Sequence, residues 1–154
     1  MRKGENMTQH PPLLLAEDDD NHVYLVHRFL TKGGLVNPIL AIGDGAEAVA
    51  YLRGEGQYAD RSTYPLPAVV ITDLGMDGTS GLEVLRTVRA HPALRDTPVV
   101  VMTGSTADAD IDAVHQLGAS AYLVKPVAFD ALLDVIRRLG LPWALQRPEK
   151  AAAL

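Results

Sequence analysis

Polar side chains suited to phosphate chemistry follow four apolar runs that are typical of buried β-strands. The residues at these strand ends are Glu17 and Asp18, Asp73, Thr103, and Lys125. The carboxyl ends of parallel strands share one edge of a sheet, where open α/β folds place their ligands. Carboxylates bind hard cations or act as nucleophiles, and hydroxyl and ammonium groups stabilise phosphoryl oxygens. The set therefore fits phosphoryl transfer.

Each residue type has its own task in that chemistry. Asp73 supplies a carboxylate nucleophile that can form an acyl phosphate. Glu17, Asp18 and Asp73 together can hold Mg²⁺, without which such close carboxylates would raise one another's pKa. Thr103 and the Gly104 amide can donate to a phosphoryl oxygen, and the lysine after the fifth strand supplies a positive charge.

The acidic residues also admit a simpler interpretation. Asp73 alone would read as a turn or helix-capping aspartate. Asp19 and Asp20 precede a helical stretch, and acids favour the first turn of a helix. Glu17 and Asp18 stand at the strand end itself, where a bound cation explains them more simply.

Strand-like and helix-like segments alternate along the chain. Strands are expected at Leu13–Ala16, Ile39–Ile42, Ala68–Thr72, Val99–Met102 and Ala121–Val124, and helices at Asn21–Lys32, Ala46–Arg53, Leu82–Ala90, Thr106–Leu117 and Ala128–Leu139. Ser80 and Glu83 match a capping box at the start of the third helix. The alternation predicts a doubly wound α/β fold, with a five-stranded parallel sheet and five helices.

Composition limits the class of protein. The chain has 154 residues, no cysteine and a formal net charge of −5. The lack of cysteine excludes a disulfide framework and a thiol nucleophile, and the negative net charge without a basic stripe argues against nonspecific binding of nucleic acid. No apolar run approaches the roughly 20 residues that span a bilayer. We expect a cytoplasmic protein with no membrane or nucleic-acid partner. Its parts would be a flexible leader at 1–12, one domain at 13–140 and a tail at 141–154.

The chain resembles the receiver domain of two-component response regulators. It carries LLLAEDD, ITDLGMDGTSG, VVMTGS and YLVKP in the order and at the spacing of the four receiver motifs. The resemblance runs from Leu13 to about Gly140. It implies the flavodoxin-like receiver fold and a phosphoryl group taken from a sensor histidine kinase.

The resemblance also implies a role for each position that matches a motif. Asp73 would be the phospho-acceptor. Mg²⁺ or Mn²⁺ would be bound by Asp18, Asp73 and the Gly75 carbonyl directly, and by Glu17 through water. Phosphate would be bound by Thr103, the Gly104 amide and Lys125, and Thr103 and Tyr122 would act as the conformational switch. A protein of this kind catalyses only its own phosphorylation and dephosphorylation.

Two features depart from the common receiver pattern. Asp77 replaces the usual proline four residues after the acceptor, and the loop Arg53–Pro67 is longer than in chemotaxis-type receivers. The residues after Gly140 are too few for an output domain. These features resemble the single-domain regulators that are paired with phytochrome-type histidine kinases, whose output would pass through the receiver surface.

Several residues outside the motifs admit two interpretations. Leu25 and Phe29, with His22, widen the apolar stripe of the first helix beyond one core face, so they either flank the core or form a kinase-docking patch. The histidines lack metal-ligand spacing and are expected at the surface or facing a partner. Trp143 either folds back or enters an interface. The resemblance favours a homodimer through the fourth helix, fifth strand and fifth helix, assisted by the tail.

Two other classes of function are alternatives. A small aspartate-nucleophile phosphatase would place a second aspartate two residues after its nucleophile, where this chain has Gly75. A phosphorylation-independent adaptor would not require the intact acidic set.

Overall fold

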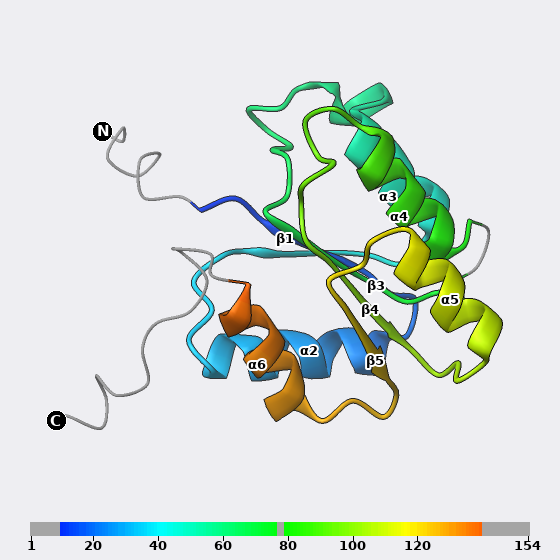
Figure 1. The fold of residues 1–154 in the computed structure, drawn as a ribbon. Helices are drawn as coiled ribbons and strands as arrows, with labels where there is room; N and C mark the ends of the chain where they lie inside the picture. The colour runs from blue at the N-terminus through cyan, green and yellow to red at the C-terminus, as the bar shows by residue number, and fades with distance from the viewer. Residues whose placement is uncertain (1–9, 77–78, 140–154) are drawn as a thin grey trace, which may run out of the picture.

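The computed structural model describes residues 10–76 and 79–139, and Figure 1 shows one twisted sheet between two layers of helices. The strands are β1 (Leu13–Ala16), β2 (Ile39–Ile42), β3 (Val69–Thr72), β4 (Val99–Thr103) and β5 (Ala121–Val124). The helices are α2 (Asp20–Lys32), α3 (Gly45–Arg53), α4 (Gly81–Ala90), α5 (Asp108–Gln116) and α6 (Phe129–Arg138), with a short 3₁₀ helix, η1 (Gly56–Ala59). No helix of the described residues is long and apolar enough to cross a membrane.

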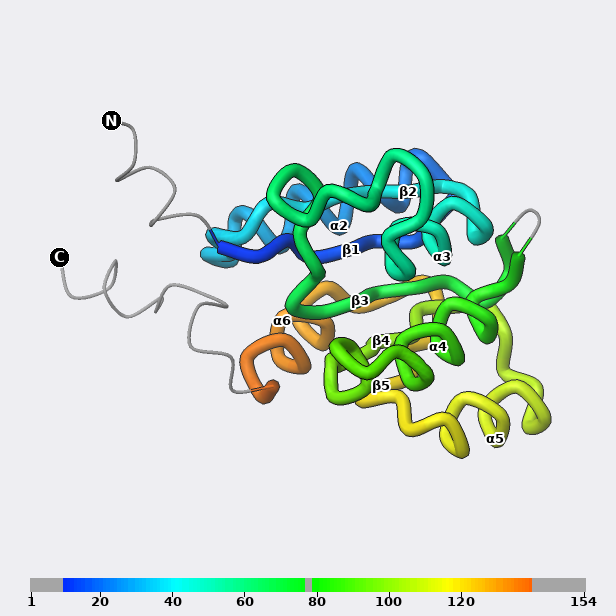
Figure 2. The backbone as a smooth tube through the Cα atoms, turned by 90° about the horizontal axis from the view of Figure 1, so that it is seen from above, coloured from blue at the N-terminus to red at the C-terminus, as the bar shows by residue number. Residues whose placement is uncertain are grey.

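All neighbouring strands are parallel, in the order β2-β1-β3-β4-β5, which can be followed from one edge to the other in Figure 2. Ala16 at the end of β1 pairs with Thr72 at the end of β3, so these two strands end at the same level. The predicted doubly wound α/β fold is therefore confirmed.

The two faces of the sheet have separate cores. Helices α2 and α6 cover one face and α3, α4 and α5 cover the other (Figure 1). Leu15 and Ile71 belong to the apolar cluster on the first side, and Leu14 and Val70 to the cluster on the second. All four side chains are fully buried, and each such burial contributes about 1.5–3 kcal/mol. This alternation explains why the central strands read as unbroken apolar runs.

Helix starts follow local capping more closely than the sequence pattern does. Asp19 caps α2, because its carboxylate accepts from the Asn21 and His22 amides. Ser80 is the N-cap residue of α4, as predicted. Its side chain makes no capping hydrogen bond, however, so the predicted capping box is wrong. The Gly81 amide instead donates to the backbone of the preceding loop.

Helix α5 begins two residues later than predicted, at Asp108 rather than Thr106. The reason lies in Ser105, whose hydroxyl accepts from the Ala107 amide and donates to Asp110. This serine turn occupies the residues before α5 and delays the first helical turn.

The long loop after α3 is more structured than a polar connection. It contains η1 and packs Tyr58 and Tyr64 against Tyr51 of α3. The centroid of the Tyr58 ring lies 5.0 Å from that of Tyr51 and 5.1 Å from that of Tyr64. The Arg61 guanidinium donates to the Leu52 carbonyl at 2.8 Å. Aromatic packing of this kind stabilises the loop.

Candidate functional site

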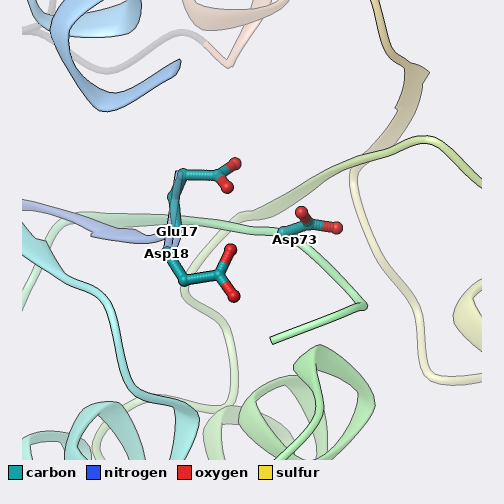
Figure 3. A group of neighbouring side chains, drawn as sticks. All are labelled: Glu17, Asp18 and Asp73. Atoms are coloured by element: carbon teal, nitrogen blue, oxygen red, sulfur yellow. The ribbon is translucent and has the colours of Figure 1, made fainter. Parts of the chain in front are cut away.

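Three acidic side chains meet at the carboxyl edge of the sheet. Carboxylate oxygens of Glu17, Asp18 and Asp73 lie within 4.8 Å of one another. In Figure 3 the side chains of Glu17 and Asp18 extend to the side on which Asp73 lies. Glu17 and Asp73 are buried and Asp18 is exposed. Because β1 and β3 end at the same level of the sheet, they bring together acids that lie far apart in the sequence.

Lys125, which follows β5, lies between two of these carboxylates. Its Nζ donates to Glu17 Oε1 at 2.8 Å and to Asp73 Oδ2 at 2.9 Å. Burial acts to lower the pKa of Lys125, but the hydrogen bonds and charges of Asp73 and Glu17 outweigh burial and raise the pKa above its ordinary 10.5. The ammonium form is therefore favoured and balances part of the acidic charge.

The run of consecutive aspartates divides between the site and the helix. Asp19 caps α2 with its carboxylate, and Asp20 stands in the first turn of that helix, as the sequence predicts. The Asp19 amide also donates to Glu17 Oε2 at 3.1 Å. Asp18 is the member of the run that lies in the acidic cluster.

The backbone around Asp73 is closely held. The Gly75 amide donates to Asp73 Oδ1 at 3.1 Å, and the Thr72 hydroxyl donates to the Asp73 carbonyl at 2.9 Å. Gly81, the first residue of α4, lies so close that a Cβ there would be 1.9 Å from the Asp73 carbonyl oxygen. Only glycine permits this approach of helix to loop. Asp77, the departure from the receiver pattern, lies outside the described residues.

Thr103 and Tyr122 are joined through a residue that sequence reasoning missed. Thr103 is buried at the end of β4, and its Oγ1 accepts from the Ser105 amide at 3.3 Å. The Tyr122 hydroxyl donates to the Ser105 carbonyl at 2.9 Å. A serine in a loop gives no sequence signal of these partners. Gly104 between them is exposed.

His22 does not lie at the surface, contrary to expectation. Its side chain is 13% exposed, and its Nδ1 lies 3.2 Å from Glu17 Oε1. The physical reason is that α2 starts immediately after the acidic strand end, so its first turn covers Glu17. Leu25 and Phe29 are 36% and 39% exposed, and the Phe29 ring also stacks on Phe129 of α6 at a centroid distance of 4.3 Å. Both side chains therefore remain accessible on α2, and Phe29 also packs against α6.

The donor chemistry of the acidic cluster suits a hard divalent cation. Three carboxylates converge on one point, and Mg²⁺ and Mn²⁺ prefer oxygen ligands of this kind. Lys125 supplies one positive charge next to two of them. The residues present therefore fit a divalent metal.

Fold and site together define a class of protein. It is a doubly wound α/β domain whose acidic, lysine-bridged cluster occupies the ligand-binding edge of the sheet. The profile of the response regulator receiver domain matches residues 13–137, and the chain belongs to this family of two-component signalling proteins. Receiver domains bind a divalent metal and are phosphorylated by histidine kinases.

Individual relatives make the resemblance more specific. Response regulator Rcp1 of Synechocystis sp. is 30% identical over 135 residues, which is 86% of this chain and 90% of Rcp1. The probable methanogenesis regulatory protein FilR2 of Methanothrix harundinacea is 35% identical over 132 residues, 85% of this chain and 82% of FilR2.

Solved structures of relatives share this fold. The bacteriophytochrome response regulator RtBRR superposes with a TM-score of 0.76 at 38% identity, over 93% of this chain and 87% of RtBRR. The Mn²⁺-bound form of Rcp1 superposes with a TM-score of 0.73 at 27% identity, over 90% of this chain and 100% of Rcp1. The predicted resemblance to phytochrome-associated response regulators is confirmed.

Proposed function

We propose that this chain accepts a phosphoryl group from a sensor histidine kinase on Asp73, with Mg²⁺ or Mn²⁺ as cofactor, and signals through altered protein contacts. The observation that supports this function best is the meeting of Asp73 with Lys125, Glu17 and Asp18 at one edge of the sheet. Membership of the receiver family supports the same function and does not favour a phosphatase.

The proposed step is an in-line displacement at phosphorus. A carboxylate oxygen of Asp73 attacks the phosphorus of the kinase's phosphohistidine, an O–P bond forms and the P–N bond breaks. The imidazole leaves with the electron pair of that bond and takes a proton from water. The Gly75 amide holds Oδ1 and the Lys125 ammonium holds Oδ2, so the carboxylate is oriented before the donor arrives.

Other groups at the same edge would stabilise the phosphoryl oxygens. Lys125 supplies an ammonium, and the Gly104 amide a backbone donor. The Thr103 hydroxyl accepts from Ser105, so its own hydrogen remains for donation. A divalent cation, when bound, would neutralise phosphoryl charge. Its proposed direct ligands are Asp18, Asp73 and the Gly75 carbonyl, with Glu17 acting through water.

The acceptor is tested by replacing Asp73 with a near-isosteric residue that is not nucleophilic. Asp73→Asn should abolish the mass increase that acetyl phosphate and Mg²⁺ produce in the wild type, while the unfolding midpoint stays close to that of the wild type. Asp96→Asn, at an exposed loop position, is the matched control and should be labelled normally. Labelling of Asp73→Asn at the wild-type rate would refute the assignment, and release of phosphate with rapid turnover would indicate a phosphatase.

The kinase partner is proposed to be of the phytochrome type, because Rcp1 and RtBRR are similar to this chain. Its docking surface would lie on α2, where Leu25 is 36% exposed and Tyr24 60% exposed. His22 is on the same helix, but its side chain is only 13% exposed, so it would lie behind this docking surface rather than in it. A cytoplasmic location follows from the proposed kinase partner.

The output is proposed to pass through the switch residues. Phosphorylation would draw the Thr103 hydroxyl toward the phosphoryl group and release Tyr122 from Ser105 to turn toward the core. Such a shift can be only as large as the differential contacts of the phosphoryl group in the two states. The surface that changes is that of α5, β5 and α6.

A homodimer through this surface is a further element of the proposal. Ile111 of α5 and Val124 of β5 are 36% and 41% exposed, and their burial would favour association. Ile111→Asp should lower the mass measured by light scattering at high concentration, whereas Tyr24→Asp on α2 should not. A wild type that stays monomeric with and without a phosphate mimic would contradict the dimer.

Trp143 and the proposed tail (141–154) lie outside the described residues. The proposed leader (1–12) and domain (13–140) lie partly outside them.

A further inference from the structure

The His22 ring is held against the acidic site but has no hydrogen-bond partner there. Its Nδ1 lies 3.2 Å from Glu17 Oε1, and the two side chains are 13% and 1% exposed. Both ring nitrogens are shielded from solvent, and neither has a hydrogen-bond partner among residues 10–76 and 79–139. Buried polar atoms are normally paired, because leaving one unpaired costs its full desolvation. The position of this imidazole therefore calls for an explanation.

An aromatic pair keeps the imidazole in place. The Phe129 ring lies 6.3 Å from the His22 ring, and the same Phe129 stacks on Phe29 at 4.3 Å with an interplanar angle of 4°. Phe129 begins α6, shortly after Lys125 at the end of β5. The imidazole is thus confined between this pair and Glu17, within reach of the carboxylate.

Glu17 depends on a lysine that it shares. Its Oε1 accepts from Lys125 Nζ at 2.8 Å and its Oε2 accepts from the Asp19 amide at 3.1 Å. The same ammonium bonds Asp73 at 2.9 Å. In the described part of the chain, Lys125 and His22 are the two basic side chains within 4.0 Å of Glu17. If Lys125 turns away, His22 is the nearest side-chain replacement.

We propose that His22 is a positioning residue that takes over from Lys125 as the donor to Glu17 when Lys125 turns to the phosphoryl group on Asp73. The inference rests on the proposed function. It requires only the neutral imidazole with its hydrogen on Nδ1 and a small rotation of the ring. Glu17 then keeps a donor on each oxygen and remains oriented toward the cation site. In the unphosphorylated state the imidazole has no hydrogen-bond partner among the described residues.

Two substitutions separate this role from simple packing. His22→Phe keeps a ring against Phe129 and removes the donor, whereas His22→Asn keeps an amide donor close to the Nδ1 position and removes the ring. Acetyl phosphate serves as the phosphodonor, so that contact with a kinase does not enter. We expect His22→Phe to lower the final ratio of phosphorylated to unphosphorylated protein about tenfold, the size of one hydrogen bond to a charged group. We expect His22→Asn to stay within about threefold of the wild type. The opposite ranking would show a packing role and overturn the inference.

A second measurement needs no phosphorylation. Unfolding by urea in the presence of a chelator is compared for wild type, His22→Phe, Lys125→Met and the double variant. His22→Phe should change the unfolding equilibrium constant little when Lys125 is present, and about tenfold more when Lys125 is replaced. Additive effects would overturn the inference.

The two measurements also distinguish failure of this inference from failure of the proposed function. A wild type that acetyl phosphate does not label, together with coupled effects in unfolding, would refute the proposed function and support the exchange of donors at Glu17. If the double variant does not fold, the ranking of His22→Phe and His22→Asn in the labelling assay decides.

Discussion

The Gly81→Ala substitution tests how tightly α4 holds the loop that carries Asp73. A Cβ at position 81 would lie 1.9 Å from the Asp73 carbonyl oxygen and 2.7 Å from the carbonyl carbon. Real Cβ atoms essentially never approach closer than 3.0 Å, so this separation has to grow by about 1 Å. The obstructing atoms are backbone and cannot rotate away. The loop, the helix start or both have to move.

Two opposing effects set the expected magnitude. Overpacking of this kind costs about 1–3 kcal/mol, while replacing glycine by alanine in a helix contributes up to about 1 kcal/mol in the other direction. A net loss of about 1–2 kcal/mol in the free energy of unfolding is therefore expected. The loss of function should be larger, because a 1 Å misplacement of a reacting group can lower a rate about a hundredfold. The labelling rate should thus fall much further than stability alone would require.

The assay combines urea unfolding with the initial rate of labelling by acetyl phosphate. Gly43→Ala is the matched control at the same edge of the sheet, because its Cβ would meet the Glu17 carbonyl oxygen at 3.4 Å, an ordinary contact. That variant should stay within about 0.5 kcal/mol of the wild type and keep its labelling rate. If Gly81→Ala behaves like Gly43→Ala in both measurements, the close approach of α4 to Asp73 does not position the acceptor.

Two further predictions concern the charges of the site. Asp18→Ala should weaken Mn²⁺ binding, measured by titration calorimetry, far more than Asp19→Ala or Asp20→Ala, because Asp18 lies in the acidic cluster while the other two begin a helix; equal losses for all three would refute this placement. Lys125→Met should be less stable than the wild type below pH 10.5, and the difference should shrink as pH rises through the higher folded-state pKa, because the raised pKa means that the folded protein favours the ammonium. A difference that stays constant in urea unfolding over this range would show that the lysine contributes by packing alone.

The sheet was predictable from sequence because the physical signal is local. The run Val69–Thr72 is apolar at every position except its last, and a strand covered by helices on both faces has no polar side to display. Asp73 then marks the strand end, since a carboxylate placed one residue earlier would lie in the core. The acidic site follows from applying the same rule to β1, with Glu17 and Asp18 at its end.

The contacts within the site were not predictable in the same way. Lys125 reaches Glu17 across 108 positions of sequence, and nothing near either residue specifies that the ammonium is shared with Asp73. The direction of the His22 side chain depends on where α2 begins, and a shift of one residue would turn the ring by about 100°. Such a shift lies within the usual uncertainty of a helix start. The sequence therefore indicates which residue types meet but not which atoms bond.

The topology explains why the site forms between β1 and β3 and not elsewhere along the edge. In the strand order β2-β1-β3, the chain first places β2 on one side of β1 and then places β3 on the other side. The helix that follows β1, α2, covers one face of the sheet, and the helix that follows β3, α4, covers the other (Figure 1). The connections after these two strands therefore part in opposite directions and leave their carboxyl ends uncovered by backbone. Asp73 and Glu17 can be buried there and still face a common opening, because the surrounding elements cover their sides and not the edge itself.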